Sequence, residues 1–157
     1  MTTSEINSLI NELNRKISWY ADNRKLFAGG CCYAAYLLAR GFEKLGVKYT
    51  TIIYQDGPNW NTNKFRKVCY GGDGCGHVAI RVVYKHKKFE IGSRTSAVDR
   101  MTAVMSHYGK WMAREYRKVT SDDLKDMYWS NDWNETWDTD RNGVLAMEIG
   151  KIFAKYM

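Results

Sequence analysis

The strongest constraint on the fold is a helical pattern that stops at a glycine and continues directly into a strand pattern. Apolar residues recur at helical spacing from Cys31 to Leu45, in the row Cys31, Ala35, Leu38, Phe42 and Leu45. Gly46 is suited to end this helix, because glycine adopts the left-handed conformation of a C-terminal cap without strain. Residues 47–54 are rich in β-branched and aromatic side chains, which favours a strand. The chain therefore combines helices with a sheet.

More sheet is expected in the middle of the chain. Residues 77–84 and 88–91 are two apolar stretches separated by a short basic turn, a pattern typical of an antiparallel hairpin. Residues 60–76 are polar and glycine-rich, with at most one short strand around 65–70, so they are expected to form a loop. A further strand is predicted at 114–119.

Further helices are predicted on both sides of these strands. Residues 5–20 carry Ile6, Leu9, Ile10, Leu13 and Ile17 at helical spacing, with Thr2 and Glu5 in the register of a capping box. Helices are also expected at 97–112, from Thr120 to Tyr128, and at the C-terminus. The order predicts one α+β domain over residues 1–157, with N-terminal helices packed on a mostly antiparallel sheet.

Bulk properties restrict the class of protein. No stretch approaches the roughly 18 consecutive apolar residues of a membrane helix, and the N-terminus does not resemble a signal peptide. The four cysteines fall in two close pairs, 31–32 and 69–75, which favours thiols over a disulfide framework and predicts a cytoplasmic protein without membrane contact. The net charge of +7 is spread over nearly every segment, so it supports nucleic acid only weakly as a partner.

Cys31 is the candidate nucleophile. It stands at the start of a predicted helix, where unpaired N–H groups and the helix dipole lower the pKa of a thiol. The preceding Gly29 and Gly30 let the backbone turn sharply, and the N–H of Cys31 can donate to a developing oxyanion. The competing thiol is Cys32, whose helical row fits a core face less well, so Cys32 is interpreted as structural.

His77 is the candidate general base. A nucleophile and its imidazole meet in space and need not be close in sequence, so the three histidines are compared by their surroundings. His86 lies in the basic turn and His107 in the expected helix 97–112, whereas His77 begins an apolar strand that can hold the ring in place.

A carboxylate is expected to orient the imidazole. Glu90 lies on the strand that should pair with the strand opened by His77. Asp73 and Asp99 are the alternatives for this role.

These residues resemble a known family pattern. Gly30-Cys31, Ala35, Leu38 and Leu45-Gly46, followed by a strand, are similar to the nucleophile helix of transglutaminase-like proteins in the papain-like superfamily. The stretch from Gly76 to Val82, then a turn and Phe89-Glu90-Ile91-Gly92, is similar to the family's histidine strand and acid strand. The resemblance covers about residues 29 to 93. It departs from the family where Glu90 stands in place of an Asp that is often followed by Pro.

The resemblance implies a papain-like fold and acyl-transfer chemistry on amides. The expected activity is that of a peptidase, deamidase or transglutaminase acting on a protein or peptide substrate through Cys31, His77 and Glu90. The family also contains members that have lost catalysis, so the alternative is an inactive papain-like module that binds a protein or nucleic acid. A phage or bacterial conflict system is a compatible setting.

Two patterns resemble metal sites but lack part of the required ligand set. Cys69, Cys75 and His77 are spaced too loosely for zinc, which favours cysteines two to four residues apart. Residues 138–149 open like a calcium loop, but the twelfth position is Ile149 in place of a bidentate carboxylate. This segment is expected to cap the last helix, and no metal or cofactor is predicted.

Overall fold

The computed structural model describes residues 1–23, 30–56, 75–91, 111–129, 140 and 142–157. Four helices lie in this part of the chain: α1 (Thr3–Asp22), α2 (Gly30–Leu45), α5 (Ser121–Trp129) and α7 (Val144–Ala154). Four strands accompany them: β1 (Tyr49–Asp56), β2 (Cys75–Tyr84), β3 (Lys87–Ile91) and β4 (Trp111–Tyr116). None of the described helices is long and apolar enough to cross a membrane.

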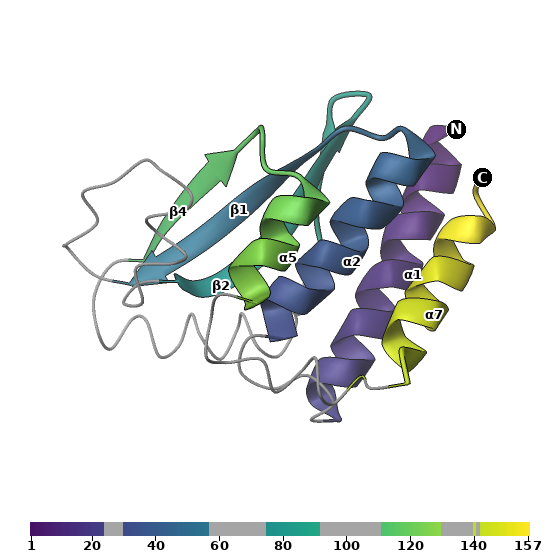
Figure 1. Ribbon diagram of the computed structural model, residues 1–157. Helices are drawn as coiled ribbons and strands as arrows, with labels where there is room; N and C mark the ends of the chain where they lie inside the picture. The colour runs from purple at the N-terminus through teal and green to yellow at the C-terminus, as the bar shows by residue number, and fades with distance from the viewer. Residues whose placement is uncertain (24–29, 57–74, 92–110, 130–139, 141) are drawn as a thin grey trace.

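The strands form one antiparallel sheet in the order β3-β2-β1-β4. Figure 1 shows the described helices gathered on one side of this sheet, with α7 on the outside. The hairpin between β2 and β3 is closed by Lys85 and His86 alone, whose φ angles of 46° and 69° match the left-handed residues of a tight hairpin turn. The predicted α+β class and the antiparallel hairpin are confirmed.

Helix α1 begins as its sequence predicted. The Thr2 N–H donates to the Glu5 carboxylate at 2.6 Å, and the Glu5 N–H donates to the Thr2 hydroxyl at 3.1 Å, which is a reciprocal capping box. These hydrogen bonds, the backbone one first, lower the pKa of Glu5. All five residues of the expected apolar stripe are buried.

Helix α2 lies at the centre of the fold, in contact with β2, α5 and α7. Leu38 and Phe42 are completely buried, and so are the β2 residues Val78, Ile80 and Val82 of the same core. Gly46 follows the helix with a φ of +72°, so the predicted glycine C-cap is confirmed. Helix α2 and strand β2 thus pack against one another through a shared apolar core.

The expected elements differ from the structure near β4. Residues 111–112 were expected to close a helix, but they belong to β4, which ends at Tyr116 instead of continuing to 119. Thr120 does cap α5, because its hydroxyl accepts the Asp123 N–H at 3.2 Å. The rest of the expected helix 97–112 and most of the loop 60–76 lie outside the described residues.

Candidate active site

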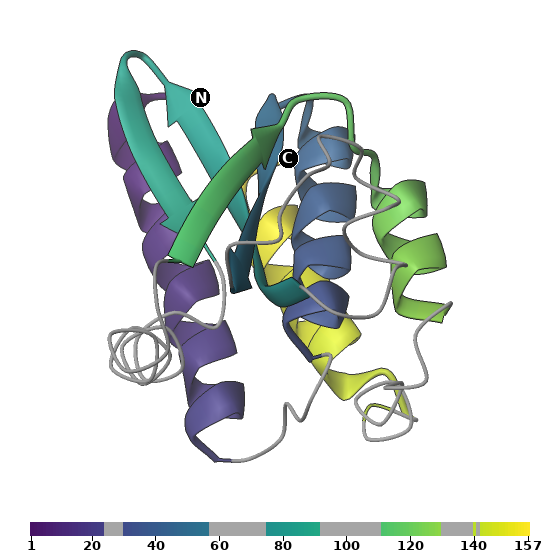
Figure 2. The same cartoon turned by 90° about the vertical axis from the view of Figure 1, so that its left-hand side faces the viewer.

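The backbone of Cys31 occupies the second position of α2, which begins at Gly30. The position at a helix N-terminus that the sequence predicted for this residue is therefore confirmed. His77 is the third residue of β2, near the beginning of the strand. Figures 1 and 2 show the N-terminal end of α2 and the beginning of β2 at the same end of the molecule. The fold thus places at one end of the molecule two element ends that lie more than forty residues apart in sequence.

The neighbouring cysteine belongs to the core. Cys32 is 5% exposed, as expected for a structural residue. Its helical row is buried as well, because Tyr36 is 8% and Ala39 0% exposed. The Cys31 row contains Ala35, Leu38 and Phe42 at 1%, 0% and 0% exposed, so both rows face the core and the Cys32 row is slightly the more exposed of the two.

The first turn of α2 is tied to the start of α7 by a partly buried polar contact. The Tyr33 hydroxyl donates to the Asp140 carboxylate. The same carboxylate accepts the backbone N–H groups of Leu145 at 2.9 Å and Ala146 at 3.4 Å. Asp140 therefore caps α7, as the sequence predicted for this segment, and also anchors the turn that carries Cys31.

Sequence reasoning did not find Tyr33 as part of this anchor. Tyr33 and Asp140 are separated by 107 positions, so no local pattern connects them. The available signal was Asp140 three residues before Gly143, where a carboxylate can reach the unpaired N–H groups of a helix start. Its partner across the fold becomes visible only once α2 and α7 are packed.

We expect Asp140→Ala to lower the free energy of unfolding by about 1–2 kcal/mol, because two helix N–H groups and the Tyr33 hydroxyl lose their acceptor. Urea unfolding measures the change. The exposed neighbour Asn142 is the control, and Asn142→Ala should change stability by less than about 0.5 kcal/mol. Equal effects of the two substitutions would contradict the anchoring role of Asp140.

An irregularity in the sheet lies directly beside His77. His77 pairs with Tyr54, whereas the next residue of β1, Gln55, pairs with Cys75, so one residue of β2 is bulged out. Bulges redirect the chain and occur frequently next to active sites. The alternation of β2 after the bulge puts position 77 in the row of Ala79 and Arg81, on the face of the sheet opposite the row of Val78, Ile80 and Val82 that shares a core with α2.

Glu90 does not lie opposite His77. The register of the hairpin pairs Glu90 with Arg81, four positions further along β2, or roughly 13 Å at the usual strand rise. The Arg81 guanidinium lies 3.4 Å from the Glu90 carboxylate and also 3.4 Å from Glu115 on β4. The expectation that β3 returns Glu90 toward His77 is therefore not met by the register.

Of the other candidate bases and acids, only His86 lies among the described residues. His86 is an exposed residue of the hairpin turn, in agreement with its exclusion as a base. His107, Asp73 and Asp99 lie outside the described residues. Within the described part of the chain, no group of three His, Cys, Asp or Glu side chains gathers in a way that could hold a metal ion.

Comparison of the chain with protein-family models, with curated proteins and with solved structures finds no match. Its function is therefore inferred from its own residues and geometry.

Proposed function

We propose that this protein is a cysteine-dependent hydrolase or acyltransferase acting on amide bonds, with Cys31 as nucleophile and His77 as base. The observation that carries the proposal is that Cys31 stands in the first turn of α2, at the end of the molecule where β2 begins, and His77 is the third residue of β2. A helix N-terminus stabilises a thiolate, and a strand end holds an imidazole on a rigid element. A papain-like arrangement of helix and sheet is part of the proposal.

The proposed reaction has two halves. Cys31, its proton passed to His77, attacks the amide carbonyl, and the backbone N–H groups at the start of α2 donate to the oxyanion that forms. The C–N bond then breaks, His77 returns the proton to the departing amine, and a thioester on Cys31 remains. Water or a second amine, deprotonated by His77, attacks the thioester and releases the thiol, which completes hydrolysis or acyl transfer.

The proposal restricts the essential pair to Cys31 and His77. Glu90 is engaged with Arg81 and lies four register positions away from His77. In this reading it supports the sheet and does not orient the imidazole. The reduced thiol that the reaction requires is compatible with the cytoplasm.

The test is the pH dependence of thiol alkylation, followed with iodoacetamide and peptide mass spectrometry. We expect Cys31 to react with a midpoint at least one pH unit below the free-cysteine value of about 8.5, while the buried Cys32 stays protected. His77→Ala should move the midpoint of Cys31 back toward that value, because the imidazolium no longer stabilises the thiolate.

Two matched variants sharpen this test. His86→Ala removes an exposed turn histidine and should leave the midpoint unchanged. Glu90→Gln should also leave it unchanged if Glu90 serves only Arg81, and a shift would restore Glu90 to the site. If the Cys31 midpoint lies near 8.5 and does not change in His77→Ala, the result favours an inactive binding module instead.

A further inference from the structure

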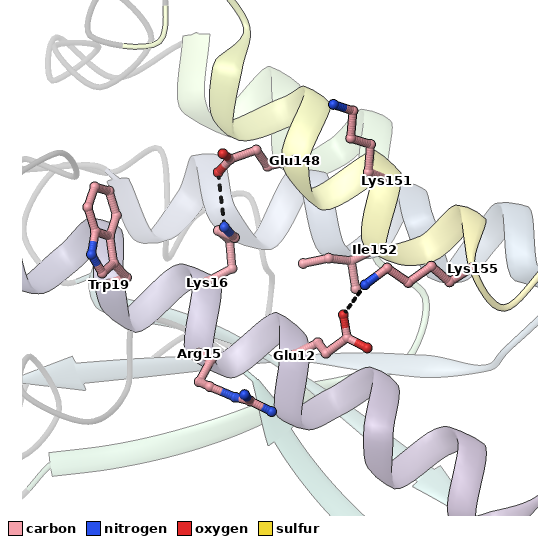
Figure 3. A pocket seen from close by; sticks show the side chains of 8 residues that line it. All are labelled: Glu12, Arg15, Lys16, Trp19, Glu148, Lys151, Ile152 and Lys155. Carbon is pink, nitrogen blue, oxygen red and sulfur yellow. Dashed lines mark hydrogen bonds and ion pairs between the residues drawn. The ribbon is translucent and has the colours of Figure 1, made fainter.

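Helices α1 and α7 run antiparallel on the outer side of the fold and leave a groove between them (Figure 3). The groove has a volume of about 610 Å³ and is open to solvent. Its walls are mainly charged: Arg15 and Lys16 on α1, Lys151 on α7 and Lys155 directly after it, with one glutamate from each helix. Neither the candidate catalytic pair nor the sheet contributes to this groove.

The two carboxylates in the groove are already engaged. Glu12 accepts from Lys155 at 2.7 Å and from the Tyr156 hydroxyl at 2.8 Å, and these hydrogen bonds, the one from Lys155 first, lower its pKa. Glu148 lies 3.4 Å from Lys16 and accepts the Tyr20 hydroxyl at 3.1 Å. The negative charge of the groove is thus neutralised internally.

Tyr20 remains a donor in this network at ordinary pH. Its burial, together with the hydrogen bond to Glu148, raises the pKa of Tyr20 to about 12. The phenol therefore stays protonated and adds no negative charge beside the groove.

Two cations remain for a ligand. Among the described residues, neither Arg15 nor Lys151 forms an ion pair. Figure 3 shows them on the two outer flanks of the groove, with Arg15 pointing away from α7 and Lys151 pointing away from α1. Four cationic and two acidic side chains leave an excess of two positive charges. An anionic ligand with at least two separated charges would complement this arrangement.

An exposed aromatic ring stands at one end of the same groove. Trp19 is 52% exposed and touches the Tyr20 ring edge-to-face, with 5.2 Å between centroids. Figure 3 shows the indole beyond Lys16, past the ion pair with Glu148. Trp19 thus stands beside the ion-paired Lys16, and its exposed indole offers a flat face on which a planar ring can stack.

We propose that this groove binds single-stranded nucleic acid, with phosphates on Arg15 and Lys151 and a base stacked on Trp19. The distance along α1 from Glu12 to Trp19 is seven residues, or about 10 Å, which accommodates about three stacked nucleotides. Phosphate-binding cations combined with an aromatic platform are how proteins hold single strands without reading sequence. An acidic peptide would use the cations but not the indole, so the exposed Trp19 favours the nucleic acid.

The experiment measures fluorescence anisotropy of a fluorescein-labelled ten-nucleotide oligo-dT with the full chain. Trp19→Ala should raise the Kd about tenfold, since one base–aromatic stack is lost. The double variant Arg15→Glu with Lys151→Glu should weaken binding further and flatten the salt dependence of log K by about 1.4, the value for two phosphates on a single strand.

The matched control is the double variant Lys87→Glu with Lys125→Glu, which reverses the charge of two exposed lysines outside the groove. It changes the net charge by the same amount as Arg15→Glu with Lys151→Glu. This variant should keep the wild-type salt slope. Thermal unfolding of each variant checks that the fold is kept, and the single substitution Lys151→Gln repeats the test if Arg15→Glu unfolds the chain.

The alternative ligand is tested in the same assay by competition with a decamer of glutamate. Competition at a similar concentration, together with normal oligo-dT binding by Trp19→Ala, would overturn the proposal in favour of an acidic peptide. If the control variant weakens oligo-dT binding as much as the groove variant does, the binding comes from general attraction by the net charge. That result would overturn the proposal as well. Cys31→Ala should bind normally, so the outcome is independent of catalysis.

Discussion

Gly41→Ala should lower the free energy of unfolding by about 2–3 kcal/mol, although alanine is the best helix former and Gly41 lies inside α2. A Cβ at this position would stand 2.1 Å from the Phe153 ring of α7. Phe153 is 1% exposed and packs edge-to-face on Phe42 with 5.1 Å between centroids. The ring has no free space to move into, so the clash must separate α2 from α7.

Gly150 is a matched control for this prediction. It lies in α7, where an added Cβ would have no neighbour within 4 Å, so Gly150→Ala should stabilise the protein by about 0.5–1 kcal/mol through helix propensity alone. Phe153→Leu should reduce the penalty of Gly41→Ala in a double-mutant cycle, because the smaller side chain vacates the contact. Urea unfolding measures the wild type, the three single variants and the double variant, and a stabilising Gly41→Ala would contradict the close approach of the two helices.

The elements that were predicted correctly have local causes. The α1 capping box needs only Thr2 and Glu5, three residues apart, and the end of α2 needs only a glycine able to adopt positive φ at position 46. The position of Cys31 at the helix start follows from the same pattern. Such features depend on neighbours in sequence, and the sequence therefore specifies them.

The misplaced candidate, Glu90, shows how register decides a site. Recognising the hairpin was sufficient to predict that β3 pairs with β2, but its turn determines which residues face each other. A turn of Lys85 and His86 alone puts Glu90 opposite Arg81, and counting outward from those two residues would have shown it. The strand of Glu90 does lie beside the strand of His77, but the Glu90 residue itself lies beside Arg81.

Contacts between distant segments were beyond any local pattern. Ser121 lies 78 positions from Glu43, and its side chain is 7% exposed at the start of α5. The bulge beside His77 likewise arises from pairing between β1 and β2. These features depend on packing that brings the segments together, and only the folded chain displays them.

The contact between Ser121 and Glu43 should contribute strongly to the free energy of unfolding. The Glu43 carboxylate accepts the Ser121 N–H at 2.8 Å, the Ser121 hydroxyl at 2.6 Å and the Tyr49 hydroxyl at 2.6 Å. It thereby joins α2, β1 and α5. Glu43→Ala should destabilise the protein by about 2 kcal/mol, because the buried donors of Ser121 lose a charged acceptor. The control Lys44→Ala, at an exposed neighbouring residue, should lower the free energy of unfolding by less than about 0.5 kcal/mol.

The charge of Glu43 makes this contribution depend on pH. Burial alone would raise its pKa, but the hydrogen bonds from Ser121 and Tyr49 outweigh burial and leave the pKa of Glu43 below its ordinary value. A carboxyl group whose pKa is lowered by folding stabilises the protein above its unfolded pKa of about 4.3, and the stabilisation disappears as the pH falls through the folded value. The difference in unfolding free energy between wild type and Glu43→Gln should therefore be larger at pH 7 than at pH 3. A difference that stays constant over this range would show that the side chain acts through its shape and not through its charge.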